Sequence, residues 1–200
     1  MLRFHKFISV LLHPIVIPTI GVFLFLTLTP EVINKDRQYL LLSIVFFSTY
    51  ILPILLLIIL KALGVVKTFQ VVSIKERKVP LFIMLFVFYI LGWVLIKIPV
   101  FKDLGVLFYG TNLALILCYV LFFFNIKTSL HVLSMGSAFG FFLIYGALHD
   151  IAILPIAIVI VVLTGLLASS RLYLKAHKPL EVYLGFFLGI TTQCLGYVLL

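Results

Sequence analysis

Charged residues are scarce in this chain of 200 residues: they make up 10% of it, while apolar residues make up 64%. A soluble domain has about a quarter of its residues charged, so the composition excludes a soluble protein and predicts one that lies in a bilayer. Acidic residues are the scarcest, with six Asp and Glu against fifteen Lys and Arg and a formal charge of +9. Because these cations lie among long apolar runs, we expect them to meet anionic membrane lipid and not nucleic acid.

Several other signals are missing. Cys118 and Cys194 are the only cysteines and both lie in apolar runs, so we expect them to pack as small hydrophobic side chains without forming a disulfide. The apolar N-terminal stretch contains Pro14 and Pro18 and lacks a small-x-small cleavage site, which favours a retained first span over a cleaved signal peptide. The alternating segments of about ten residues that build a membrane β-barrel are absent as well.

Long apolar runs between charged clusters are what the chain does have. Each is close to the length of about 20 residues that a helix needs to cross the hydrocarbon core. We therefore predict an all-α, polytopic transmembrane bundle of six to seven spans, forming a single membrane domain over residues 1–200. The candidate spans are 7–28, 39–60, 80–99, 104–124, 130–148, 151–169 and 182–200.

Two of these spans contain glycines one helical turn apart. Gly136 and Gly140 lie in the fifth span, and Gly185 and Gly189 in the seventh. Small residues at this spacing let helix backbones approach closely. We expect both helices to make a tight contact, and a homo-oligomer through the glycine-containing faces is one form that this contact can take.

The charges sort unevenly between the two sides of the membrane. With seven spans, the N-terminus and the segments 61–79, 125–129 and 170–181 share one side, which carries eleven basic and two acidic residues against four of each on the other. The positive-inside rule would make this the cytoplasmic side. Alternatively, part of the excess forms an anion site, since cations beside helix ends act together with the helix dipole.

Two histidines favour the anion site. His131 lies at the start of the fifth span, and His177 precedes Glu181 at the start of the seventh. An ionisable group near membrane depth is costly and is a functional-site candidate by default. One histidine can attack phosphorus while the other protonates the departing oxygen, and a carboxylate beside the nucleophile fixes its tautomer. The pattern indicates phosphoryl chemistry, with phosphate neutralised by Arg171, Lys127 and the cluster Lys75, Arg77, Lys78.

These residues carry a resemblance. Ser170-Arg171-x5-His177-x3-Glu181 resembles the third signature of the type 2 phosphatidic acid phosphatase superfamily, Ser-Arg-x5-His-x3-Asp, with Glu in place of Asp. From the composition, a chance match is on the order of one in ten thousand. Thr128-Ser129-Leu130-His131 resembles the second signature, Pro-Ser-Gly-His, and Lys75-Glu76-Arg77-Lys78-Val79-Pro80 loosely resembles the first, Lys-x6-Arg-Pro. The likeness covers about 75–181, and the general organisation is similar to short Bacteroidota members.

The resemblance implies a motif-bearing core over about 75–200 that hydrolyses a phosphate or pyrophosphate monoester of a lipid, without metal or cofactor. It implies that His177 becomes a phosphohistidine, that His131 is the general acid and that Glu181 takes the place of the family Asp. Arg171, Ser129 and one of Lys75, Arg77 and Lys78 would bind phosphate, together with Lys127. It also implies a bacterial inner-membrane protein whose site faces the periplasm, against the charge rule. The expected partners are a lipid phosphate or prenyl pyrophosphate substrate and membrane lipids.

Two alternatives remain open. Leu130 stands where the family glycine lets the backbone approach an anion, and the first signature is irregular. Both observations favour a catalytically degenerate member, or a binder or carrier of anionic lipid. An intramembrane metalloenzyme using His131, His177 and Glu181 is the other alternative, although no short metal-ligand spacing such as His-Glu-x-x-His supports it.

Overall fold

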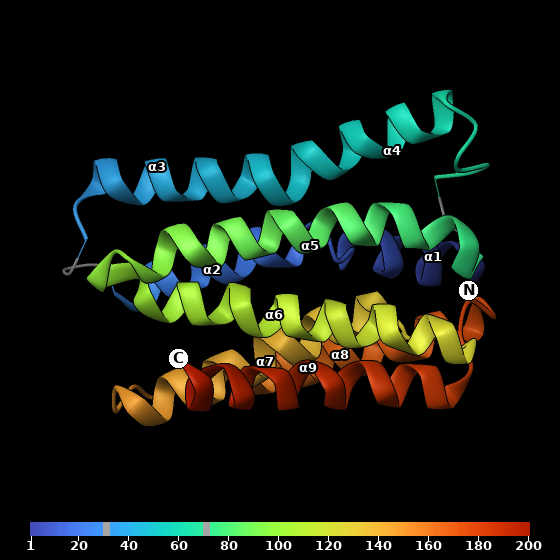
Figure 1. Cartoon of the computed structure of the whole chain (residues 1–200). Coiled ribbons are helices and arrows are strands. Elements are labelled where there is room, and N and C mark those ends of the chain that lie inside the picture. Colours follow the sequence, from blue (N-terminus) through green and yellow to red (C-terminus); the bar gives the residue numbers. More distant parts are fainter. Residues whose placement is uncertain (30–32, 70–72) are drawn as a thin grey trace.

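The computed structural model describes residues 1–29, 33–69 and 73–200, and within these residues it is all-helical, which confirms the predicted fold class. The long helices run side by side in one bundle (Figure 1). The helices are α1 Leu2–Leu11, α2 Ile17–Leu28, α3 Lys35–Phe46, η1 Phe47–Ile51, α4 Leu52–Ala62, α5 Ile74–Ile96, η2 Pro99–Phe101, α6 Lys102–Leu121, η3 Phe122–Phe124, α7 Leu130–Leu148, α8 Leu154–Tyr173 and α9 Pro179–Leu199.

Six segments of the described chain are long and apolar enough to cross a membrane, as expected for a multi-pass membrane protein. They are Lys35–Ala62, Ile74–Ile96, Pro99–Phe124, Leu130–Leu148, Leu154–Tyr173 and Pro179–Leu199. Several of these helices begin before the corresponding apolar run does, because an N-terminal cap starts the helix within charged sequence. At the start of α5, Ser73 Oγ accepts a hydrogen bond from the Glu76 amide at 3.3 Å, and the Glu76 carboxylate accepts one from the Ser73 amide at 3.3 Å.

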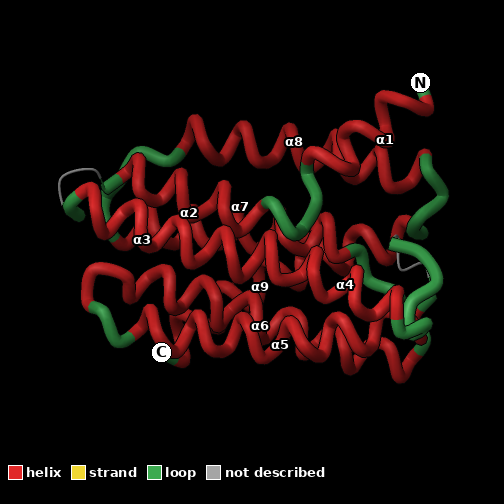
Figure 2. Tube along the Cα trace, turned by 90° about the horizontal axis from the view of Figure 1, so that it is seen from above, coloured by secondary structure: helices red, strands yellow, loops and turns green. Residues whose placement is uncertain are grey.

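The first predicted span, 7–28, is wrong as one continuous helix. α1 ends at Leu11 and α2 begins at Ile17. The break follows from Pro14, which has no amide hydrogen and disfavours helical geometry at the preceding residue, His13. α1 consequently packs against α8, whereas α2 packs against α3 and α7 (Figure 2).

The two ends of the bundle differ in what they contain. The N-terminus, the start of α5, the start of α7 and the link from α8 to α9 lie at one end, and the C-terminus and the turn between α7 and α8 lie at the other (Figure 1). The broken first segment therefore still crosses the length of the bundle. All three sequence signatures come to the same end, as the alternation of spans predicts.

Among the described helices α7 and α9 make the most extensive contact, and glycines permit it. A Cβ added to Gly136 would overlap the carbonyl oxygen of Phe186, and one added to Gly189 would lie 2.5 Å from that of Leu133. A Cβ on Gly185 would lie 2.7 Å from the carbonyl oxygen of Ser129. The predicted tight contact is thus made within the chain, and association of copies through glycine faces stays a prediction.

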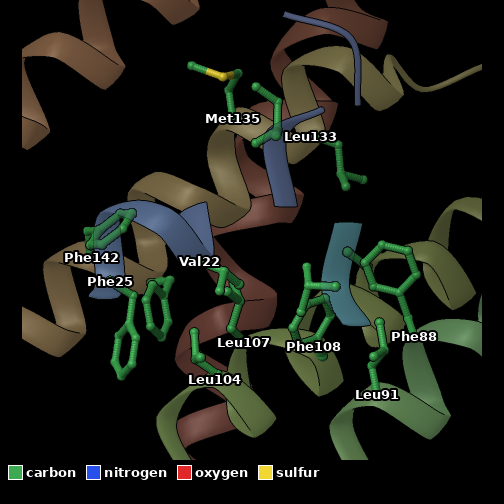
Figure 3. Packing of buried hydrophobic residues seen from close by; sticks show 14 of the residues in the cluster. Val22, Phe25, Phe88, Leu91, Leu104, Leu107, Phe108, Leu133, Met135 and Phe142 are labelled. Carbon is green, nitrogen blue, oxygen red and sulfur yellow. The ribbon is translucent and has the colours of Figure 1, made fainter. Parts of the chain in front are cut away.

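Aromatic side chains pack α2 against α7 and α5 against α6 within the buried core (Figure 3). Phe25 of α2 packs beside Tyr145 of α7, with ring centroids 5.2 Å apart, and Phe88 of α5 packs beside Phe108 of α6 at 5.7 Å. Both cysteines are free thiols, and Cys118 packs in this core as expected, whereas Cys194 is exposed and does not.

Candidate functional site

His177 is buried in the link between α8 and α9, and its ring is oriented by two acceptors. Nδ1 lies 2.9 Å from Oε2 of Glu181 and 3.1 Å from the carbonyl oxygen of Lys127. Because both neighbours are acceptors, Nδ1 carries the hydrogen, and the neutral ring has its lone pair on Nε2. Nε2 is buried and has no hydrogen-bond partner among the described residues. This is the tautomer that a nucleophilic histidine requires.

The start of α9 is what places Glu181. Pro179 occupies the first position of the helix, where its missing amide hydrogen costs nothing. The Lys178 amide donates to Oε2 of Glu181 at 3.2 Å, so the same carboxylate oxygen caps the helix and faces His177. The Ser129 amide donates to the backbone carbonyl of Glu181 at 3.1 Å. Glu181 therefore joins the third signature to the second through its backbone carbonyl, while its side chain binds within the third.

Three cations surround His177. Arg77, Arg171 and Lys127 all act on it electrostatically. Burial lowers the pKa of His177 below its ordinary value of 6.5; the hydrogen bond with Glu181 opposes this and the three cations add to it. Burial, followed by the charges of Arg77 and Arg171, also lowers the pKa of Lys127. The ring is consequently neutral at pH 7, while the positive field around it suits an anion.

Polar groups beside His177 are left without partners in the described structure. Nη1 of Arg171 donates to Oγ of Ser9 at 2.6 Å, but its Nε is buried and unpaired. Oγ of Ser129 is buried and unpaired too. Buried polar atoms without partners are rare in folded proteins because each costs free energy. The Arg171 guanidinium and the Ser129 hydroxyl are donors that an oxyanion would satisfy, whereas Nε2 of His177 carries a lone pair.

His131, the second residue of α7, has a different environment. Its Nε2 lies 3.2 Å from the carbonyl oxygen of Ser9, and its ring meets that of His13 edge to face, with centroids 4.8 Å apart. Since a carbonyl only accepts, Nε2 carries a hydrogen. Arg171 and His177 lie within electrostatic range of His131. The two histidines nevertheless line different hollows, His177 one open to the surface and His131 a cavity between helices.

That cavity has a volume of about 200 Å³ and lies between α4, α5, α6, α7 and the break that precedes α2. Arg77 and His131 line it near the end of the bundle that holds the site. Farther along the helices its wall is mostly apolar, with Leu57, Met84 and Leu115 among the lining residues. A cavity with a cationic end and a mostly apolar interior is complementary to a lipid that has an anionic head group and an apolar chain.

The basic residues of the first signature, Lys75, Arg77 and Lys78, lie in different surroundings. Arg77 is half-buried and acts on His177. Lys75 is exposed, and Nζ of Lys78 lies 5.0 Å from the ring centroid of Phe123. Of the three, the structure brings Arg77 to the site.

Metal ligands do not cluster in the described part of the chain. There, no three or more His, Cys, Asp or Glu side chains form a group that would hold a metal ion. His131, His177 and Glu181, the ligands of the metalloenzyme alternative, are therefore not arranged as a metal centre.

Sequence reasoning missed the contribution of the N-terminal helix. Ser9 contacts both Arg171 and His131, and His13 contacts His131. Pro14 was the available signal, because a proline inside an expected span breaks the helix and lets its first part pack elsewhere.

No family model, curated protein or solved structure matches the chain. Its likeness to the type 2 phosphatidic acid phosphatase superfamily accordingly rests on the signature residues alone.

Proposed function

We infer that this chain is an integral-membrane lipid phosphatase that hydrolyses a phosphate or pyrophosphate monoester of a lipid through a phosphohistidine intermediate. One observation carries this function. His177 has its Nδ1–H held by Glu181 and by a backbone carbonyl, which leaves a buried, unpaired Nε2 beside three cations. An oriented, neutral imidazole in a positive field is suited to attack a phosphoryl group.

The reaction is a double displacement. Nε2 of His177 attacks phosphorus, the bond to the lipid oxygen breaks, and that oxygen takes a proton from His131. Nδ1 of His131 supplies this proton while Nε2–H stays at the Ser9 carbonyl. The step therefore uses the imidazolium form of His131, which the negative charge of the bound phosphate stabilises against the nearby Arg171. Glu181 stabilises the positive charge that forms on His177. Water then attacks phosphorus with His131 as base, and release of phosphate restores the neutral His177.

The phosphate oxygens are bound by the groups that lack partners. Nε of Arg171 and Oγ of Ser129 donate to the anion, and Arg77 and Lys127 add positive charge. The acyl or prenyl chain of the substrate occupies the apolar cavity, so that it need not leave the membrane.

Release of inorganic phosphate by purified protein in detergent tests this function. The panel is phosphatidic acid, phosphatidylglycerophosphate, prenyl pyrophosphates and lipid A, assayed with chelator and no added metal. We expect release from at least one lipid and its loss in His177→Ala. His149→Ala is the matched control, because His149 is exposed at the opposite end of the bundle. Full turnover by His177→Ala would show the mechanism to be wrong.

Binding of anionic lipid without turnover is the second candidate, favoured by Leu130. This residue lines the cavity next to His131, where the family has glycine. If the parent chain bound vanadate but released phosphate from no lipid of the panel, we would infer a binder of anionic lipid and not a phosphatase.

We place the chain in a bacterial inner membrane with its site facing the periplasm. A single cysteine replacing Lys67, in a Cys118→Ala, Cys194→Ala background, reports the side of the site because Lys67 is exposed near the start of α5. It should react with an impermeant thiol reagent in intact cells whose outer membrane is permeabilised, and a C-terminal reporter should be cytoplasmic. Protection of that cysteine until the cells are lysed would reverse the orientation.

A further inference from the structure

The N-terminal helix α1 docks on the part of α8 that carries the third signature. Nδ1 of His5 lies 3.0 Å from Oγ of Ser170, and the His5 ring stacks on Tyr173 with centroids 4.0 Å apart. One helical turn farther along, Ser9 is buried against the site. α1 is thereby fixed in register with Ser170 and Arg171, although the resemblance to the phosphatase superfamily begins only near residue 75.

Ser9 contacts two site residues that come from different helices. Its hydroxyl oxygen accepts a hydrogen bond from Nη1 of Arg171 at 2.6 Å, and its carbonyl oxygen lies 3.2 Å from Nε2 of His131. Arg171 comes from α8 and His131 from α7. A single residue outside the motifs thus restrains the orientation of both side chains.

We propose that Ser9 is a positioning residue of this site, which holds the Arg171 guanidinium with its hydroxyl and the His131 imidazole with its carbonyl. The inference rests on the proposed function in one respect: the anion that Arg171 binds is the phosphate of that reaction. A guanidinium held on one nitrogen presents its remaining donors in one orientation, so less conformational entropy is lost when phosphate binds.

Ser9→Ala separates the two contacts, because it removes the hydroxyl and keeps the carbonyl. We expect vanadate, used as a phosphate probe and measured by calorimetry, to bind about tenfold more weakly, as for loss of one hydrogen bond to a charged group. In turnover, KM should rise more than kcat falls, since His131 stays held. Ser9→Thr retains a hydroxyl and should restore both values.

Two comparisons distinguish positioning from a general structural effect. Val10→Ala changes an exposed residue of the same helix and should alter neither value. In an Arg171→Lys background, Ser9→Ala should weaken vanadate binding no further, because the contact it removes is already gone. Thermal unfolding in detergent checks that each variant is folded.

The outcomes separate this inference from the proposed function. Turnover by the parent with unchanged vanadate binding in a folded Ser9→Ala overturns the positioning role alone. Vanadate binding that depends on Ser9, without any turnover, overturns the phosphatase and leaves the positioning role standing. A parent chain that neither binds vanadate nor releases phosphate overturns both.

Discussion

Nδ1 of His177 lies 2.9 Å from Oε2 of Glu181, with the ring in the link before α9 and the carboxylate in the first turn of that helix. The same oxygen accepts the Lys178 amide at the helix start. The carboxylate is therefore fixed by the backbone before it orients the ring. This makes its distance from His177 a property of the helix cap and not of a flexible side chain.

Removal of the charge of Glu181 should slow the chemical step. Glu181→Gln keeps an oxygen near Nδ1 but no longer stabilises the imidazolium, so we expect kcat for phosphate release to fall about 100-fold or more with little change in KM. Asp36→Asn, an exposed carboxylate in the first turn of α3, is the control and should leave kcat unchanged. A fall in kcat of less than threefold in Glu181→Gln would contradict the orienting role.

The burial of a neutral His177 should make stability depend on pH. Burial and the nearby cations lower its pKa below 6.5, so below that pH the unfolded chain binds a proton that the folded chain does not. The contribution of neutral His177 to the free energy of unfolding is therefore fully present above pH 6.5. It is lost as the pH falls from 6.5 towards the pKa of the folded state. Thermal unfolding of the parent should show this loss and His177→Gln a smaller one. Equal pH dependence in both would refute the prediction.

The contact between α7 and α9 should not tolerate a side chain at Gly185. A Cβ there would lie 2.7 Å from the Ser129 carbonyl oxygen, so Gly185→Ala should destabilise the fold by about 1 to 3 kcal/mol and displace Ser129. Gly165→Ala in α8 is the matched control, because nothing lies within 4 Å of its added Cβ. Thermal unfolding midpoints in detergent compare the two, and equal midpoints would mean that α9 can shift to make room.

A bulky residue in the cavity should select against long chains. Leu57 lines the cavity, and its neighbour Ile58 is exposed on the outer surface of α4. We expect Leu57→Trp to reduce kcat/KM about tenfold for long-chain lipid phosphates and to spare short-chain ones, since it fills the space for the chain. Ile58→Trp should have no effect on the chain-length series. The same loss for short and long chains would place the lipid chain elsewhere.

Much of the fold could be predicted from local sequence because the bilayer admits few structures. A membrane span must satisfy its own backbone, so long apolar runs become helices, and their alternation brings the segments around Arg77, Ser129 and His177 to one end. Helix ends were less predictable. Ser73 caps α5 and Pro179 begins α9 within charged or polar sequence, which counting of apolar residues places outside the spans.

The candidate site was predicted in part, for a similar reason. His177 and Glu181 are four residues apart, so their pairing is local and follows from the sequence. Whether Lys75, Arg77 or Lys78 reaches them depends on the rotation of α5 against its neighbours, which no local pattern records. Ser9 is farther still from the signatures along the chain and has no motif of its own.

The sequence by itself determined an all-helical membrane bundle, the side on which its cations gather, and the local pair of His177 and Glu181, because each depends on hydropathy or on spacing within one turn. The tertiary structure alone decided that α1 packs against α8 and places Ser9 between Arg171 and His131. It also decided that the glycine pair of α7 lies against the backbone of α9, and that of α9 against the backbone of α7. Those contacts join residues far apart in the chain, and they form only where the packing of whole helices brings them together.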